Sequence, residues 1–250
     1  MRPTLSAPVG SEVEVSSLGL TLRALRPLLE DADVTEICIN RPGEAFVERR
    51  SGWARTTLPF ADFDWCMRLG KLVANATMQS ISAERPILSG SLPNGERIQI
   101  VLPPATTNNC VSITIRRPSE GVRTVAELSA GGLFDQCVPA SDALDESEVN
   151  LLALLEKRSY QDFLRLAVQS RKNIIVSGPT GSGKTTFTKG LILDIPPEER
   201  LITIEDAQEL VLDRQPNHVR LYYSKDGQGQ ARVTPKQLLE SCLRMRPDRI

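Results

Sequence analysis

The sequence predicts two fold classes in one chain: an N-terminal α+β half with a mostly antiparallel sheet, and a C-terminal α/β half. Asn94-Gly95 lies between strand-like runs at 87–92 and 97–102, and Asn-Gly is the strongest short signal for a hairpin. After residue 171, strand-like and helix-like runs alternate, which is typical of a parallel sheet. The 250 residues are enough for two modest domains.

The N-terminal half is predicted to combine helices with an antiparallel sheet. Residues 1–16 are small, polar and proline-containing, so we expect them to be disordered. In residues 35–40 the odd-numbered side chains, which include two isoleucines, face one way and the even-numbered side chains face the other, which indicates a strand buried on one face only. Asp62 is a suitable N-cap for a helix over residues 62–76. The other elements expected in this half are a helix at 18–30 and strands at 45–49, 53–58, 87–92, 97–102 and 111–116.

The C-terminal half is predicted to build the parallel sheet. Residues 201–204 form a near-continuous apolar run, as expected of a strand buried on both faces. Thr234 and Gln237 form a capping box, with Pro235 at the first helical position, so a helix begins there and ends at Pro247. The other expected elements are helices at 148–158, 161–169 and 186–193, strands at 173–177 and 219–223, and a strand that begins at 248.

The run from Gly178 to Thr185 fits G-x-x-x-x-G-K-[ST], the phosphate-binding P-loop. Its glycines allow a tight turn that points successive N–H groups into one concavity, with a helix N-terminus behind it. We expect Lys184 to reach the β- and γ-phosphates and the Thr185 hydroxyl to ligate Mg²⁺. A chance glycine-rich turn is disfavoured, because a strand-like run precedes the motif and a helix-like run follows it. The expected nucleotide-binding residues are Gly178, Pro179, Thr180, Gly181, Ser182, Gly183, Lys184, Thr185 and Thr186.

Two acidic residues, Glu205 and Asp206, follow directly after the apolar run at 201–204. In open parallel sheets, ligands bind outside the carboxyl ends of the strands, so this pair is expected near the γ-phosphate. Glu205 is then expected to orient or activate the attacking water, or to bind Mg²⁺ through water. The alternative interpretation is a solvated acidic turn.

Several arginines have two interpretations. Arg97, Arg116 and Arg117 lie on or at the ends of N-terminal strands, and their position alone favours surface charges. The functional interpretation is that guanidinium groups from a second domain contact phosphate and stabilise charge in the transition state. Arg244 and Arg246, on the last predicted helix, either face a nucleotide across a subunit boundary or face water.

Composition limits the functional classes. The formal net charge of −1 argues against a strongly basic nucleic-acid surface. The N-terminus has no apolar core of a secretory signal, and no stretch approaches the length of a transmembrane helix. We therefore expect a cytoplasmic protein, at most peripheral to a membrane.

The P-loop is one of several motifs that together resemble the hexameric traffic ATPases of type IV secretion systems, within the superfamily of secretion and pilus-motor ATPases. The resemblance covers nearly everything after about residue 16. The runs that carry it are Asn40–Glu44, Gly95–Ile100, Ser112–Ser119, Gly178–Thr185, Arg200–Asp206, Pro216–Val219 and Ser241–Pro247.

This resemblance implies a domain plan. Residues 17–118 would form a sensor-like α+β domain, 119–147 a connecting segment, and 148–250 a RecA-like ATPase domain. The family pattern continues with an apolar strand ending in Glu and a box containing Gly and His. The resemblance therefore implies that the RecA-like domain is incomplete at its C-terminus and that ATP hydrolysis is weak or absent.

The resemblance also implies roles, cofactors and partners. ATP and Mg²⁺ would bind between the two domains, with Lys184, Glu205 and Asp206 as catalytic residues and Thr185 and Glu205 at the metal. Arg97 and Arg116 match N-terminal arginines that approach the phosphates, which reverses the interpretation from position alone. The chain would form a homo-hexamer on the cytoplasmic side of the inner membrane. Its partners would be secretion-channel components and a secreted protein or DNA–protein complex, and its motion would drive substrate transfer or pilus assembly.

Three alternatives stay open. One is a type II secretion or pilus ATPase of the same superfamily, although the tetracysteine zinc module frequent in that branch is absent from this sequence. Another is a nucleotide-binding module that assembles with little hydrolysis. The third is a RecA-like nucleic-acid motor, which salt-dependent DNA binding and DNA-stimulated hydrolysis would indicate.

Overall fold

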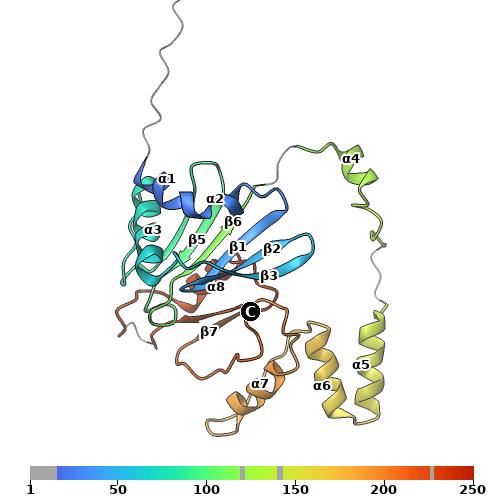
Figure 1. Ribbon diagram of the computed structural model, residues 1–250. Helices are drawn as coiled ribbons and strands as arrows, with labels where there is room; N and C mark the ends of the chain where they lie inside the picture. The colour runs from blue at the N-terminus through green and yellow to red at the C-terminus, as the bar shows by residue number, and fades with distance from the viewer. Residues whose placement is uncertain (1–15, 119–121, 140–142, 226–227) are drawn as a thin grey trace, which may run out of the picture.

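The computed structural model describes residues 16–118, 122–139, 143–225 and 228–250. Figure 1 shows a large sheet with α1–α3 on one side and β7 and α8 on the other. The mixed α+β and α/β fold class is therefore confirmed. Residues 1–15, predicted to be disordered, and residues 119–121, at the predicted domain boundary, lie outside the described residues.

The helical layer of the N-terminal half is built from α1 (Ser17–Leu22), α2 (Arg26–Leu29) and α3 (Phe63–Ala76). The helix predicted at 18–30 is divided, because a 3₁₀ turn, η1 (Arg23–Leu25), separates α1 from α2. Pro27 in the first turn of α2 has no N–H and disfavours helical geometry in the residue before it. The predicted cap of α3 is confirmed, since the Trp65 N–H donates to the Asp62 carboxylate at 2.7 Å.

The large sheet contains six antiparallel strands in the order β3-β2-β1-β6-β5-β4. The hairpin predicted at Asn94-Gly95 joins β4 to β5, and Gly95 takes the positive φ of +93° that such a turn requires. The strands are β1 (Val34–Arg41), β2 (Glu44–Arg49), β3 (Gly52–Thr57), β4 (Ile87–Ser91), β5 (Arg97–Val101) and β6 (Ser112–Arg116).

Both faces of the central strand β1 are buried, so the prediction of a half-buried strand is wrong. Ile37 and Ile39 face the helices and belong to the N-terminal apolar core. Asn40 is on the opposite face, and its side-chain amide donates to Asn217 Oδ1 at 3.0 Å. The C-terminal half therefore lies against the second face of the sheet, which the period of the sequence alone does not reveal.

The C-terminal half contains a parallel strand pair and a set of helices. The pair is β7 with β8, and the capping box predicted at Thr234 and Gln237 opens α8. No helix in the described ranges is long and apolar enough to cross a bilayer. The elements are α4 (Val125–Ala130), α5 (Glu146–Glu156), α6 (Tyr160–Gln169), α7 (Lys184–Ile192), β7 (Leu201–Glu205), β8 (His218–Tyr222) and α8 (Pro235–Cys242).

The strand predicted at residues 173–177 does not form. Ile175 is 92% exposed, and no strand in the described part of the chain pairs with this segment. A strand needs a neighbour for its backbone groups, but β7 pairs only with β8 and makes one further bridge, from Leu201 to Arg249. That bridge is all that appears of the strand predicted to begin at 248.

Candidate active site

The glycine-rich loop has a backbone that only glycine adopts easily. Gly181 and Gly183 have φ angles of +80° and +87°, in the left-handed region. A Cβ at Gly178 would lie 2.6 Å from Ser182 Oγ, so a larger residue there would force the Ser182 side chain to move. The loop runs into α7, whose first turn has no side-chain cap. The N–H groups at the start of α7 are therefore oriented toward any anion held by the loop.

Lys184, the first residue of α7, folds back over this loop. Its ammonium Nζ donates to the carbonyl oxygens of Gly178 and Pro179 at 2.8 and 2.7 Å. In the described part of the chain no carboxylate pairs with it. Neutral carbonyls are weaker partners for an ammonium than a phosphate is, so the charge of Lys184 remains available to an anionic ligand.

A cavity of about 250 Å³ brings the P-loop and the acidic pair together. Lys184 and Thr185 line one side of it, and Glu205 and Asp206 line the other. Of the predicted nucleotide-binding residues, Lys184 and Thr185 line this cavity, whereas the following do not: Gly178, Pro179, Thr180, Gly181, Ser182, Gly183 and Thr186. The remaining lining residues, which the sequence did not single out, are Val176, Thr188, Ile204, Ala207, Glu209 and Leu210.

Glu205 is held on every side. Arg220 on β8 donates to both carboxylate oxygens, at 3.1 and 3.0 Å, and the Thr203 hydroxyl donates at 2.7 Å. The backbone N–H groups of Glu209 and Leu210 donate to the same carboxylate at 3.0 Å each. The Glu205 side chain is 6% exposed. In this geometry Glu205 anchors the loop that carries Asp206, and neither of its oxygens is free to hold a water or a metal.

Arg220 was not predicted as part of the site. The parallel pairing of β7 with β8 places Arg220 opposite Thr203, and its side chain reaches diagonally to Glu205. The only signal in the sequence is an arginine within a largely apolar strand. Its contact with Glu205 depends on the register of β7 against β8, which the local sequence does not determine.

The electrostatics of Glu205 follow from these contacts. Burial alone would raise the pKa of Glu205, but the hydrogen bonds from Arg220, Leu210 and Thr203 outweigh it and lower that pKa below its ordinary value. Glu205 therefore stabilises the fold as a carboxylate, and this contribution is lost as the pH falls toward its lowered pKa.

Asp206 is the more available carboxylate of the pair. Its side chain is 37% exposed and forms an ion pair with Lys225. A hydrogen bond from Lys225 lowers the pKa of Asp206, so this side chain is ionised at neutral pH. An ion pair with a lysine that is 71% exposed is easily exchanged, so Asp206 can turn toward a ligand in the cavity at little cost.

We expect Arg220→Gln to destabilise the protein by about 3 kcal/mol at pH 8, because the Glu205 carboxylate would stay buried without its cation. Without that cation, the pKa of Glu205 is higher in the variant than in the wild-type protein. The loss of stability should therefore shrink as the pH falls and Glu205 becomes protonated. Urea unfolding across this pH range measures both effects. The matched control is Arg26→Gln, which breaks an exposed pair with Glu30 and should change little. A loss for Arg220→Gln that does not vary with pH would contradict this description of Glu205.

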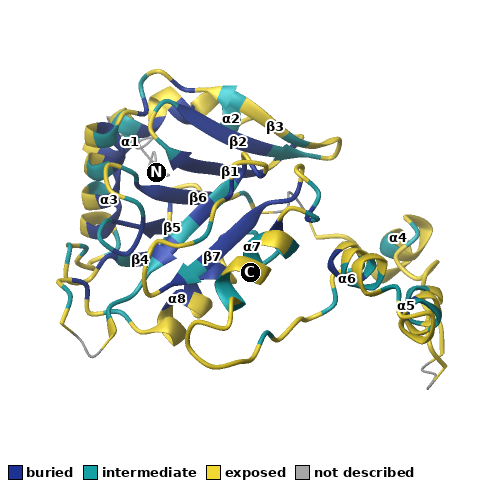
Figure 2. Ribbon diagram, turned by 90° about the horizontal axis from the view of Figure 1, so that it is seen from below, coloured by how far each residue is buried: buried dark blue, intermediate teal, exposed yellow. Residues whose placement is uncertain are grey.

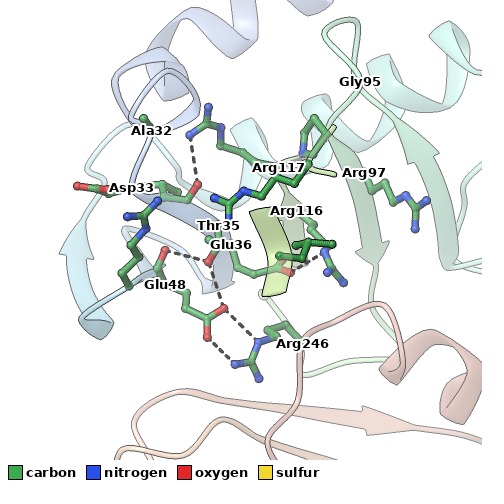
Figure 3. A pocket seen from close by; sticks show the side chains of 15 residues that line it. Ala32, Asp33, Thr35, Glu36, Glu48, Gly95, Arg97, Arg116, Arg117 and Arg246 are labelled. Atoms are coloured by element: carbon green, nitrogen blue, oxygen red, sulfur yellow. Dashed lines mark hydrogen bonds and ion pairs between the residues drawn. The ribbon is translucent and has the colours of Figure 1, made fainter. Parts of the chain in front are cut away.

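Arg97 and Arg116 line a different cavity. They are register partners on β5 and β6 and stand at the wall of a cavity of about 1040 Å³, shown in Figure 3. Among the described residues, none lines both this cavity and the P-loop cavity. The structure thus does not bring these two arginines to the P-loop, and their approach to phosphate stays a prediction. The arginines that line the large cavity are Arg50, Arg97, Arg116, Arg117, Arg123 and Arg246.

The residues around the P-loop cavity fit a nucleoside triphosphate with Mg²⁺. The loop and the uncapped start of α7 offer N–H donors, and Lys184 offers a positive charge. Thr185 and Asp206 offer the oxygen ligands that Mg²⁺ prefers. In the ranges that the structure describes, no group of three or more His, Cys, Asp or Glu side chains could hold a metal alone.

Comparison with known proteins supports the same interpretation. The family model described as "Type II/IV secretion system protein" matches residues 21–250. The chain is 48% identical over 237 residues to "Type IV secretion system protein VirB11" of Brucella suis, covering 94% of this chain and 66% of that protein. It is 44% identical over 237 residues to "Type IV secretion system protein PtlH" of Bordetella pertussis, covering 94% of this chain and 69% of that protein. The chain thus spans about two thirds of the length of these relatives.

A solved structure shares the fold. It is the crystal structure of the VirB11 ATPase from the Brucella suis type IV secretion system in complex with sulphate. It superposes with a TM-score of 0.86 at 47% identity, covering 93% of this chain and 69% of that one.

Proposed function

Since this chain belongs to the type II/IV secretion system protein family, we propose that it is an ATP-binding and ATP-hydrolysing motor subunit that powers type IV secretion. Its reaction is the hydrolysis of ATP to ADP and phosphate, coupled to domain motion. The observation that supports this proposal most strongly is the cavity that Lys184 and Thr185 share with Glu205 and Asp206.

The P-loop binds the phosphates. Lys184 exchanges its two carbonyl partners for β- and γ-phosphate oxygens, a stronger charge-assisted contact. The positive-φ glycines at 181 and 183 keep the loop open enough for its N–H groups to converge on the same oxygens.

Thr185 and the acidic pair are the residues that would hold Mg²⁺ in this cavity. Mg²⁺, when bound, neutralises charge on the β- and γ-phosphate oxygens. The Thr185 hydroxyl would be a ligand of this ion, and the Asp206 carboxylate would be available to it once the ion pair with Lys225 opens. Glu205 fixes the loop that carries Asp206, and it orients the attacking water only if it exchanges one hydrogen bond from Arg220 for that water.

Arg97 and Arg116 complete the site from outside the P-loop cavity. Because the two cavities have no lining residue in common within the described chain, both sets meet one nucleotide only after domain motion or from a neighbouring copy. This arrangement makes hydrolysis depend on the position of the N-terminal sheet, as a motor requires.

Assembly into a homo-hexamer is part of the proposal. Figure 2 shows α4 and α5 as mostly exposed, away from the two sheets. Apolar side chains on these segments face solvent, and a second copy of the chain would cover them. We propose that the ring acts in the cytoplasm at the inner membrane. Its partners are the secretion channel and a secreted protein or DNA–protein complex. The exposed apolar residues on α4 and α5 are Val125, Val149, Leu152 and Leu155, and those in the described segments next to these helices are Val122, Leu133, Phe134, Val138 and Leu144.

We expect Thr185→Ala to lower Mg²⁺-dependent ATP hydrolysis about a hundredfold, because it removes the metal's hydroxyl ligand. Binding of ATP in EDTA should stay within about twofold of the wild-type value, because the loop and Lys184 are unchanged. Thr185→Ser keeps the hydroxyl and should restore hydrolysis. Phosphate release and equilibrium binding measure the two effects. Equal losses in Thr185→Ser and Thr185→Ala would remove the hydroxyl from the proposal.

A second candidate function is a nucleotide-binding module that assembles without turnover. The observation that favours it is Glu205, whose two oxygens are both engaged by Arg220. Tight ATP binding without phosphate release would identify this module. A type II secretion or pilus ATPase is the remaining alternative within the same family.

A further inference from the structure

A row of charged residues crosses four neighbouring strands on the sheet face that meets the C-terminal half. The strand pairings place Glu48 beside Glu36, Glu36 beside Arg116, and Arg116 beside Arg97. We call these four residues the charged row. It lies where the sheet opens into the large cavity, and Figure 3 shows all four members at its wall.

Glu36 is the buried member of the row. Its side chain is 5% exposed, whereas that of Arg116 is 68% exposed. Glu36 Oε1 lies 3.5 Å from Arg116 Nε, and the buried Oε2 has no hydrogen-bond partner. The buried carboxylate therefore lies beneath the exposed arginine side chain and contacts it at Nε.

Arg97 and Arg116 repel each other. Like charges directly opposite on neighbouring strands are destabilising, and the described chain offers Arg97 no ion-pair partner. Glu36 is the one carboxylate that forms an ion pair with Arg116 among the described residues. Without its charge, nothing in the row favours Arg116 staying beside Arg97.

We propose that Glu36 is a positioning residue for ATP hydrolysis: its carboxylate holds Arg116 beside Arg97, so that both guanidinium groups face one phosphate. This inference rests on the proposed function, and it assigns to Glu36 the positioning of the two arginines for contact with phosphate. Two guanidinium groups held in fixed positions match phosphate oxygens better than one mobile group does.

The row also connects to the C-terminal half. Arg246, which follows α8, donates to both oxygens of Glu48 at 3.1 and 2.5 Å, and its guanidinium lies 5.9 Å from the centre of the Trp53 ring. Glu48 is the like-charged neighbour of Glu36, so a movement of Arg246 changes the charge that Glu36 experiences. Motion of the C-terminal half can thus alter how firmly Arg116 is held.

Glu36 carries this role at a cost to stability. Burial raises the pKa of Glu36 to about 7, against the opposing charges of Arg116, Arg246 and Arg200 and together with the like charge of Glu48. Because the folded-state pKa is raised, the ionisation of Glu36 removes stability as the pH rises from about 4.5 to about 7. A residue that served packing alone would gain from being neutral.

Glu36→Gln tests the proposal, since it keeps the shape and removes the charge. At pH 8 we expect kcat/KM for ATP to fall about tenfold while Tm rises by about 2–4 °C. Wild-type activity should fall as the pH drops below 7, whereas activity of the variant should stay flat across that range. Arg116→Ala should lose at least as much activity, and adding Glu36→Gln to it should cost nothing further.

The matched control is Glu44→Gln. Glu44 is a buried strand carboxylate paired with Arg41 and Arg55, and it does not line the large cavity. Its variant should keep the wild-type activity and pH profile. Wild-type kcat/KM in Glu36→Gln with an unchanged pH profile would overturn the proposal while the proposed function stands. Lower activity with a lower Tm would also overturn it, by assigning Glu36 a structural role. No phosphate release from the wild-type protein would remove the proposed function and this inference with it.

Discussion

Replacing Lys184 with alanine should lower the affinity for Mg·ATP about a hundredfold and bring hydrolysis below detection. Among the described residues, the ammonium donates to the carbonyl oxygens of Gly178 and Pro179, which are neutral. Its hydrogen bonds to phosphate would be charge-assisted and stronger, and the variant cannot form them. A charge-assisted hydrogen bond contributes about 1.5–3 kcal/mol, and Lys184 is expected to make more than one in the transition state.

Titration with a fluorescent ATP analogue and a phosphate-release assay measure the two losses for Lys184→Ala. Lys189→Ala is the matched control, because Lys189 lies on the same helix and does not line the cavity. It should bind and hydrolyse ATP like the wild-type protein. Full nucleotide affinity in Lys184→Ala would remove the P-loop from the proposed function.

Replacing Arg200 with alanine should cost about 3–5 kcal/mol of unfolding free energy, the largest stability effect that we expect from one substitution. Arg200 is fully buried between the sheet and the C-terminal half. Its guanidinium donates to the Met245 carbonyl at 2.9 Å and to the side-chain oxygens of Asn40 and Asn217 at 2.9 and 2.5 Å. It also lies 6.0 Å from the centre of the Trp53 ring.

The reason for so large an effect is that Arg200 satisfies partners from both halves of the chain. Its removal leaves the buried Asn40 amide oxygen without its donor, takes one of two donors from the Asn217 amide oxygen, and opens a cavity where the halves meet. Unfolding in guanidinium chloride measures the loss of unfolding free energy. Arg214→Ala, which removes an exposed arginine that donates to the Leu193 carbonyl, is the control. A loss below about 1 kcal/mol for Arg200→Ala would show that the halves are held together by other contacts.

Local signals predicted the fold where they depend on neighbours in the sequence. The Asn94-Gly95 hairpin, the Asp62 cap and the Thr234 capping box all appear in the structure. Each rests on backbone groups within a few residues, so no tertiary contact is needed to specify it. The strand predicted at 173–177 failed because an apolar run is a strand only where another strand offers it partners.

The candidate site was predictable in part for the same reason. The P-loop is a contiguous motif, and Glu205 follows a buried strand, so the sequence places both at one cavity. The engagement of Glu205 by Arg220 was not predictable, because it depends on the register of β7 against β8. The charged row is likewise a property of strand pairing, since Glu36 and Arg116 are far apart in sequence and adjacent only in the sheet.

Sustained phosphate release from Mg·ATP by the wild-type protein tests the central claim most directly. The proposed function predicts multiple turnovers that require Mg²⁺, with turnover lost in Lys184→Ala. Saturable ATP binding with no phosphate release above the protein-free rate would contradict it, and would identify a nucleotide-binding module in place of a motor.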